Sequence, residues 1–469
     1  MLRNAIMLVS GNAFGSALLL LRNLIVARLV SPEDYGIAST FAVAMSIVEM
    51  LSYFGLNQMI VVDKDGDDPH VQRAMQGFQV MRGAISSFML FVIAYPYARF
   101  LGVEHIAWAY QIIAFIPLVN GLKHFDMDRL KRHLKFGPSV ITSAVPPLVA
   151  VLTLWPIALI YNDYRIMLVS LFVQSGATVA LSHLTAERPY RIAFDFSLMK
   201  RATVFGWPLL LNGMLLFGVF NGERLIVGNR LGMADLAVFS MAITLTLTPT
   251  LVLANACQSL FLPQLSATRD RVEAFRWLGV TTVEAGMAIG LALLLGTVLI
   301  GGPLAHLLLG AKYSGILGLL VPMAVLQAVR VAKTGASTVA LARERTGNAM
   351  ASNLFRVLSL PLSWYAVTQT GNVLTVIAIG SLAEVLGFLL SLRLAAKRAG
   401  LVLRPLILPS LLSAFACVAA VIDSHSYPAQ TSWMSIFQIS HLGVALVCLA
   451  ALASMSGLRG YILRRIRRS

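Results

Sequence analysis

The sequence predicts an all-α integral membrane protein with about 14 transmembrane helices. Of its 469 residues, 58% are hydrophobic and only 12% are charged, and the mean hydropathy is +0.78. Apolar runs of roughly 17 to 25 residues recur along the whole chain, and each is long enough at ~1.5 Å per residue to cross a hydrocarbon layer of ~30 Å. A soluble domain does not carry so large an apolar fraction, so the bilayer is the expected solvent.

The predicted spans follow one another with short connections. The first apolar run is interpreted as a span because it is too long for a secretory signal and has no small-residue cleavage site. The connections do not exceed roughly 20 residues, which leaves no room for an extramembranous catalytic domain. The 14 spans are expected at 5–27, 37–61, 77–98, 106–122, 138–160, 166–183, 205–227, 236–259, 278–300, 317–341, 347–368, 373–392, 405–422 and 434–456.

Basic residues concentrate in alternate connections. With the N-terminus in the cytoplasm, the cytoplasmic segments hold 26 Lys and Arg residues and the opposite segments hold 5. The positive-inside rule then places both termini in the cytoplasm of a multi-pass protein of the cell (inner) membrane. This asymmetry accounts for the net charge of +16, so no nucleic-acid partner is expected. The acidic stretch from Asp63 to Asp68 is expected to be a solvated turn, and the C-terminal Arg cluster is expected to contact anionic membrane lipids.

An internal repeat appears at an offset of 202 residues. Arg22, Arg28 and Glu33 then align with Arg224, Arg230 and Asp235. Six spans per repeat give both copies the same orientation, so the pattern predicts two parallel six-helix lobes related by a pseudo-twofold axis along the membrane normal, plus two C-terminal helices. The expected divisions are 1–202 for the N-lobe, 203–395 for the C-lobe, and 396–469 for spans 13 and 14 with a basic cytoplasmic tail.

Several cationic residues fall at membrane depth, where charges are costly and usually face a bundle interior or a wet cavity. Guanidinium groups present a planar fork of donors that suits phosphate oxygens. The alternative is that the arginines pair internally with membrane-embedded glutamates. Arg82, near the start of its predicted span, is expected to be interfacial. The candidate substrate-binding residues are Arg22, Arg330, Arg356, Arg224 and Lys333.

Three glutamates share this depth, namely Glu49, Glu284 and Glu384. A buried carboxylate can exchange a proton or hold a cation, so they are candidates for coupling. They are equally candidates for fixed counter-ions of the arginines. Glu223, beside Arg224, is a candidate for either a helix-end ion pair or a functional group.

Small residues on the first span predict close helix packing. Gly11 and Gly15 form a small-xxx-small face. The three cysteines lie in apolar stretches and predict neither a disulfide framework nor a metal site. The sequence contains no phosphate-binding glycine loop, no His-Glu-x-x-His motif and no Gly-x-Ser-x-Gly elbow. We therefore expect a protein without cofactor or metal that is not an enzyme.

Two short segments resemble a known family. The segment from Ala27 to Gly36 (ARLVSPEDYG) resembles the turn of polysaccharide transporters and Wzx-type oligosaccharide flippases, and Glu223 to Gly232 (ERLIVGNRLG) is similar to their second-half signature. These proteins belong to the multidrug/oligosaccharidyl-lipid/polysaccharide (MOP) exporter superfamily. Ser31, Glu223 and Phe239 stand where the family often has glycine, aspartate and tyrosine, which leaves the subfamily open. The resemblance implies two lobes around a central cavity.

The resemblance also implies a cargo, a sugar chain linked to a polyprenyl pyrophosphate. The expected function is a flippase that moves this lipid-linked oligosaccharide across the cytoplasmic membrane by alternating access, for exopolysaccharide, capsule or O-antigen (lipopolysaccharide) biosynthesis. A polysaccharide polymerase and the export machinery are further candidate partners. The alternatives are a lipid II flippase, a multidrug exporter of the same superfamily and a membrane-bound polysaccharide polymerase or ligase.

Overall fold

The computed structural model of the chain describes residues 2–51, 56–62, 64–133, 135–345, 347–426, 433 and 439–466. These residues are helical almost throughout and contain no strand. Contacts divide the chain into two compact units, Met1–Ala237 and Val238–Ser469, which we call unit 1 and unit 2. The division into segments 1–202, 203–395 and 396–469 rests on the sequence repeat and stays a prediction.

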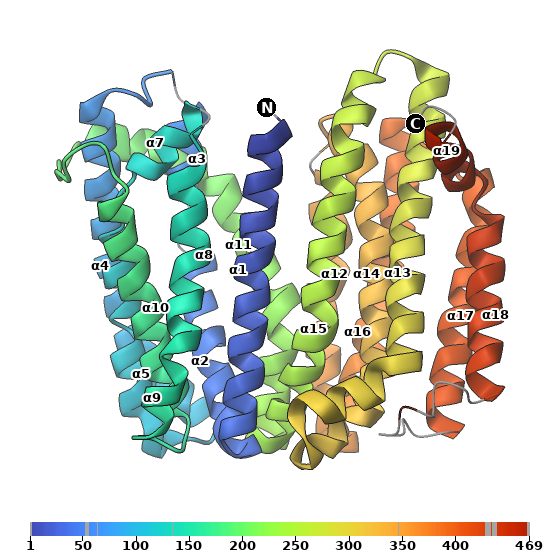
Figure 1. Cartoon of the computed structure of the whole chain (residues 1–469), viewed down its shortest axis with the longest axis horizontal. Helices are drawn as coiled ribbons and strands as arrows, with labels where there is room; N and C mark the ends of the chain where they lie inside the picture. The colour runs from blue at the N-terminus through green and yellow to red at the C-terminus, as the bar shows by residue number, and fades with distance from the viewer. Residues whose placement is uncertain are drawn as a thin grey trace. The chain divides into compact units, whose positions relative to one another are not determined.

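Unit 1 is built from the first eleven α-helices and the start of the twelfth (Figure 1). α1 packs against α8, α8 against α10, and α4 against α5 and α6, while α11 lies on α2 and α4. The helices are α1 (Leu2–Leu29), α2 (Pro32–Leu51), α3 (Leu56–Val62), α4 (Pro69–Phe100), α5 (Ala107–Ile113), α6 (Ile116–Gly121), α7 (Asp126–Arg132), α8 (Gly137–Leu152), α9 (Leu154–Ala158), α10 (Arg165–Leu184) and α11 (Phe196–Leu231), with a 3-10 turn, η1, at Glu104–Ile106.

Unit 2 holds most of α12 and the remaining helices. α13 packs along α14, α14 along α16, and α16 along α15, while α17 and α18 pair beside α13 (Figure 1). The helices are α12 (Met233–Ala267), α13 (Val272–Leu309), α14 (Leu317–Ala342), α15 (Gly347–Thr370), α16 (Val373–Ala399), α17 (Ile407–Ser426), α18 (Ile439–Ser454) and α19 (Ser456–Ile466), with 3-10 turns η2 (Ala311–Ile316) and η3 (Arg404–Leu406).

Local sequence sets the ends of several long helices. Asp68 caps α4 by accepting a hydrogen bond of 2.7 Å from the His70 amide, with Pro69 at the first helical position. Asn372 caps α16 in the same way, because its Oδ1 accepts a hydrogen bond of 2.9 Å from the Leu374 amide. At its other end α16 stops at Gly400, whose φ of +75° suits glycine.

The predicted spans coincide with helices of the described chain. Each of the 14 expected segments overlaps one helix, or two consecutive helices, although part of 434–456 and residues 52–55 of 37–61 lie outside the described residues. By length and apolar composition, nine described helices can cross a bilayer, or up to eleven if each of two bent pairs is one span. The multi-helix membrane fold is confirmed, and the count of 14 stays a prediction.

Close packing of the first helix follows the predicted glycine face. A Cβ on Gly11 would lie 2.6 Å from Val140 Cγ1, and one on Gly15 would lie 2.9 Å from the carbonyl oxygen of Ser143. Both contacts are to α8, so glycine at these positions lets α1 and α8 approach closely. On the outside, large apolar side chains such as Leu159, Phe88 and Leu446 are exposed, as expected where lipid replaces water.

Candidate functional site

Unit 1 contains a polar cavity of about 560 Å³ between α1, α2, α3, α4, α6 and α10. Its wall carries four ionisable side chains, Arg22, Glu49, Arg82 and Lys123. Three are cationic and one is anionic, so these four groups together favour an anionic occupant. Three of the predicted membrane-embedded charges of unit 1, Arg22, Glu49 and Arg82, therefore line one cavity, whereas Glu223 and Arg224 are not among its lining residues.

Arg22 of α1 lies at one wall of this cavity and is 6% exposed. Its Nη1 donates a hydrogen bond to Oε1 of Gln174 on α10. Among the described residues its buried Nε has no hydrogen-bond partner. A buried guanidinium that keeps a donor unused can donate a hydrogen bond to a ligand oxygen at little further cost of desolvation.

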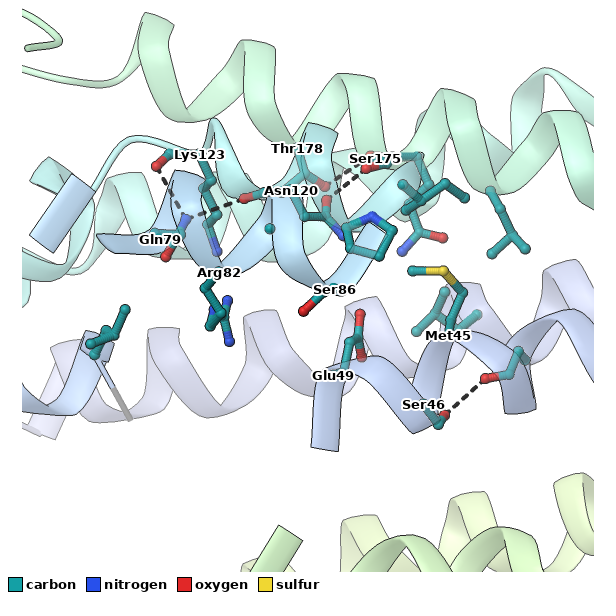
Figure 2. A pocket seen from close by; sticks show the side chains of 18 of the residues that line it. Met45, Ser46, Glu49, Gln79, Arg82, Ser86, Asn120, Lys123, Ser175 and Thr178 are labelled. Carbon is teal, nitrogen blue, oxygen red and sulfur yellow. Dashed lines mark hydrogen bonds between the residues drawn. The ribbon is translucent and has the colours of Figure 1, made fainter. Parts of the chain in front are cut away.

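Glu49 faces two cations across the cavity. It projects from α2 toward the side chains of Arg82 and Ser86 on α4, as Figure 2 shows. Lys123, in the turn after α6, lines the same space and acts electrostatically on Glu49 together with Arg82. Glu49 is exposed to the cavity, which is consistent with either of its expected roles, a counter-ion or a coupling group.

Amide and hydroxyl groups complete the wall. The Nε2 of Gln79 donates to the carbonyl oxygens of Asn120 at 3.2 Å and of Lys123 at 3.4 Å, and Ser175 Oγ donates to Asn120 Oδ1 at 2.6 Å (Figure 2). These bonds connect α4 and α10 to α6 and to the turn that follows it. Such a lining offers donors and acceptors of the kind that sugar hydroxyls use.

Unit 2 gathers three cations around one carboxylate. Glu384 of α16 is fully buried and accepts Arg330 Nε at 2.9 Å and Lys333 Nζ at 2.7 Å, both from α14. Arg356 of α15 adds an ion pair with Nε 3.4 Å from Oε1 of the same carboxylate. The four side chains carry a net charge of +2. We call them the Glu384 cluster.

Neutral amides hold the cations of the Glu384 cluster in place. Arg330 Nη1 donates to Gln327 Oε1 at 3.1 Å, and Lys333 Nζ donates to Asn353 Oδ1 at 2.8 Å. Gly387 permits the close approach of α15 and α16, since a Cβ there would lie 2.6 Å from the carbonyl oxygen of Ser352. The cluster is therefore held in place by the packing of α14, α15 and α16 and by the side-chain amides of Gln327 and Asn353.

Glu284, the third predicted glutamate, lies apart from these groups and holds the C-terminal helix. Its Oε2 accepts a hydrogen bond of 2.6 Å from the amide of Leu458, which lies in the first turn of α19. The axis turns by 69° at the break between α18 and α19. A carboxylate at a helix N-terminus satisfies free amides and complements the helix dipole.

The candidate residues thus fall into two groups. Arg22 and Arg224 belong to unit 1, where both act electrostatically on the phenol of Tyr35 on α2, and Glu223 is buried on α11. Arg330, Lys333 and Arg356 belong to unit 2 and pair with Glu384. Their role toward a substrate stays a prediction, as does that of Arg22 and Arg224.

The expectation that Arg82 is interfacial stays a prediction. α4 begins at Pro69, 8 residues before the predicted span, so Arg82 lies about 20 Å along the helix rather than at its end. It lines the cavity. Sequence reasoning also missed Lys123, Gln174 and Tyr35. Tyr35 lies inside the conspicuous ARLVSPEDYG segment, whereas nothing local marks Gln174 or Lys123.

Part of the sequence matches a family model. Residues 25–317 match the model described as "Polysaccharide biosynthesis protein". Over 256 residues the chain is 26% identical to the succinoglycan biosynthesis transport protein ExoT of Rhizobium meliloti (strain 1021). The match covers 53% of this chain and 50% of ExoT, so it spans about half the length of that relative.

Solved structures share the fold at low sequence identity. The inward closed form of the lipid II flippase MurJ aligns with a TM-score of 0.68 at 13% identity and covers 99% of this chain and 100% of that one. The inward-facing form of a multidrug resistance transporter of the MATE family aligns with a TM-score of 0.63 at 14% identity, covering 84% and 98%. The chain therefore belongs to the polysaccharide biosynthesis protein family and has the fold of the MOP-superfamily transporters.

Proposed function

We propose that the protein is a flippase that moves a polyprenyl-pyrophosphate-linked oligosaccharide repeat unit across the cytoplasmic membrane by alternating access. The product would serve exopolysaccharide, capsule or O-antigen biosynthesis. The family and the fold support a transporter of this general kind. The observation that carries the proposal is the excess of cationic groups in the polar cavity of unit 1 and in the Glu384 cluster of unit 2.

The chemistry of the cargo matches these groups. A pyrophosphate carries several negative oxygens that guanidinium forks bind in pairs. Arg22 offers an unused buried Nε beside a cavity lined with amides and hydroxyls, and the Glu384 cluster holds three cations against one carboxylate. In the proposal, Arg22 and Arg330 bind the pyrophosphate, and Arg224, Arg356 and Lys333 add to the field that attracts it. No bond is made or broken.

The charge of the unit 1 cavity separates this proposal from a multidrug exporter. A carrier of organic cations needs an excess of carboxylates, whereas this cavity has three cations and Glu49 as its acid. A lipid II flippase would use the same chemistry, because its cargo is also a polyprenyl pyrophosphate. ExoT is named for succinoglycan transport, which favours a repeat unit of a polysaccharide.

The experiment is a substitution in the living cell. In Arg22→Ala and in Arg330→Ala variants, polymer export should fail while the protein remains in the membrane, and lipid-linked repeat units should accumulate on the cytoplasmic side. Arg99→Ala is the matched control, because Arg99 is exposed at the end of α4 and pairs with Glu104 at 3.6 Å. Normal export by both variants would exclude these arginines, and a deletion strain altered only in drug sensitivity would favour a multidrug exporter.

A further inference from the structure

The two units differ sharply in charge. Unit 1 has 19 Lys and Arg residues and 15 Asp and Glu residues, whereas unit 2 has 18 and 6. Their net charges are therefore +4 and +12. The positive-inside rule accounts for basic residues in cytoplasmic connections of both units, but it does not account for the loss of acids from one of them.

In unit 1 several basic residues of the predicted cytoplasmic face are paired with acids. Arg129 forms two ion pairs, with its Nε 2.6 Å from Asp126 Oδ1 and its Nη2 3.1 Å from Glu187 Oε2. Lys135 Nζ lies 2.8 Å from Glu187 Oε1. Arg188 lies 3.7 Å from Asp67. Hydrogen bonds from Lys135 and Arg129 hold the pKa of Glu187 below its usual range, so the pairs are ionised at neutral pH. The acids of this face offset part of its basic charge.

The same face of unit 2 has a pocket walled by arginines. The pocket has a volume of about 350 Å³ and is lined by Arg269, Arg343, Arg345, Arg398, Ala399 and Gly400. The arginines come from the turn between α12 and α13, the turn between α14 and α15, and the last turn of α16. We call this the arginine pocket. Its volume is roughly ten times the ~30 Å³ of a liquid water, enough for more than one phosphoryl group.

Packing holds two of these guanidinium groups in fixed positions. Arg343 stacks over the ring of Phe275, with its Cζ 4.3 Å from the centroid, and its buried Nε has no hydrogen-bond partner among the described residues. Arg398 Nη1 donates to Oδ1 of the fully buried Asn348 at 3.0 Å. Both side chains are thereby ordered before any ligand binds, which lowers the entropy cost of binding.

The acids nearby do not neutralise the pocket. Arg269 Nη1 lies 2.7 Å from Oε1 of the exposed Glu344, and Asp270 acts electrostatically on the same arginine. Four cations against these two acids leave +2. Glu344 has a φ of +61°, and this left-handed turn lets its neighbours Arg343 and Arg345 line the same pocket.

The helix ends at this site explain only part of the charge. α12, α14 and α16 all end here, and each helix C-terminus carries the equivalent of about half a negative charge, which favours nearby cations. Three such ends offset about one and a half positive charges. The remaining excess, held on ordered planar donors around an open pocket, is typical of a site for phosphate oxygens.

We propose that the arginine pocket binds a phosphoryl anion of the diphosphate or phosphodiester type at the cytoplasmic end of unit 2. The ligand is either the head group of an anionic phospholipid or a diphosphate that is free or lipid-linked. Arg343, Arg345 and Arg398 bind its oxygens, and Arg269 completes the wall. This site does not depend on the proposed flippase function, because it is defined by binding and not by transport.

The test uses the purified full chain in detergent at ~0.15 M salt. Inorganic pyrophosphate binding is measured by calorimetric titration, and binding of phosphatidylglycerol or phosphatidylcholine by native mass spectrometry. The pocket variant is R343Q/R345Q/R398Q. The matched control is R393Q/K397Q/R404Q, which removes the same charge from exposed positions on the same face. R345Q alone is a milder variant in case the triple does not fold.

The wild type and the control should bind pyrophosphate or phosphatidylglycerol equally well, while the pocket variant binds about tenfold more weakly and R345Q about threefold. Binding of pyrophosphate alone identifies a diphosphate ligand, and binding of phosphatidylglycerol alone identifies a phospholipid head group. The proposal is overturned if neither probe binds the wild type, or if the control weakens binding as much as the pocket variant does.

Discussion

The Glu384 cluster predicts unequal losses of stability for removing its anion and for removing one of its cations. Glu384 is fully buried, with Arg330 at 2.9 Å, Lys333 at 2.7 Å and Arg356 at 3.4 Å. Glu384→Gln leaves the three cations buried without this carboxylate, which should cost about 3 to 5 kcal/mol of unfolding free energy. Lys333→Met keeps the volume and leaves two guanidinium groups on the carboxylate, so the change should stay within about 1 kcal/mol.

The two substitutions should also couple. In the Glu384→Gln background, Lys333→Met removes a cation that repels Arg330 and Arg356, so it should recover about 1 kcal/mol or more. Equilibrium unfolding in mixed detergent micelles with increasing dodecyl sulfate is followed by tryptophan fluorescence and circular dichroism. It gives the unfolding free energies of the wild type, the two single variants and the double variant. A cost for Lys333→Met equal to that of Glu384→Gln, or additive effects in the double variant, would refute this electrostatic account.

Three further predictions concern packing, the C-terminal helix and pH. Gly15→Val should separate α1 from α8 and destabilise unit 1 by about 1 to 3 kcal/mol, whereas Gly176→Val, at a glycine with nothing within 4 Å of its Cβ, should change unfolding little. Glu284→Ala should weaken the α19 cap by about 0.5 to 2 kcal/mol, seen as faster hydrogen exchange in residues 456–466; unchanged exchange, or equal acceleration in the exposed control Glu273→Ala, counts against the cap. Lys135 and Arg129 lower the pKa of Glu187 in the folded state, so this carboxylate stabilises the fold above its unfolded pKa of about 4.3 and loses that effect as the pH falls through its folded value; the wild-type unfolding temperature should therefore drop more than that of Glu187→Gln as the pH is lowered below about 4.3, and parallel pH profiles would contradict the pairing.

Hydropathy and charge predicted the helices well because each depends on a local run of the sequence. The glycine face of α1 was also readable, since Gly11 and Gly15 lie one helical turn apart and need no knowledge of their partner. The start of α4 could not be predicted from the sequence in this way, because hydropathy indicates where a chain crosses the membrane and not where the helix begins. α4 continues beyond the apolar run to its cap at Asp68, and the packing of α4 against its neighbours gives Arg82 its place in the cavity wall.

The partners of the buried charges could not be derived from the sequence. Arg330 and Glu384 are 54 positions apart, and Glu284 and Leu458 are 174 apart. Sequence reasoning grouped Glu49, Glu284 and Glu384 as candidates for either coupling groups or counter-ions, but helix packing gives them three different environments: a cavity wall, a helix cap and a cation cluster. The arginine pocket depends on three connections that only the packing of α12 to α16 brings together.

The central claim is that the protein moves a lipid-linked sugar from one face of a bilayer to the other. The most direct measurement reconstitutes the purified protein in vesicles that contain a polyprenyl-pyrophosphate-linked oligosaccharide and follows its exposure to a membrane-impermeant sugar-modifying reagent. The wild type and the Arg99→Ala control should expose the internal pool faster than protein-free vesicles do, and Arg22→Ala and Arg330→Ala should not. A wild-type rate equal to that of protein-free vesicles would contradict the account.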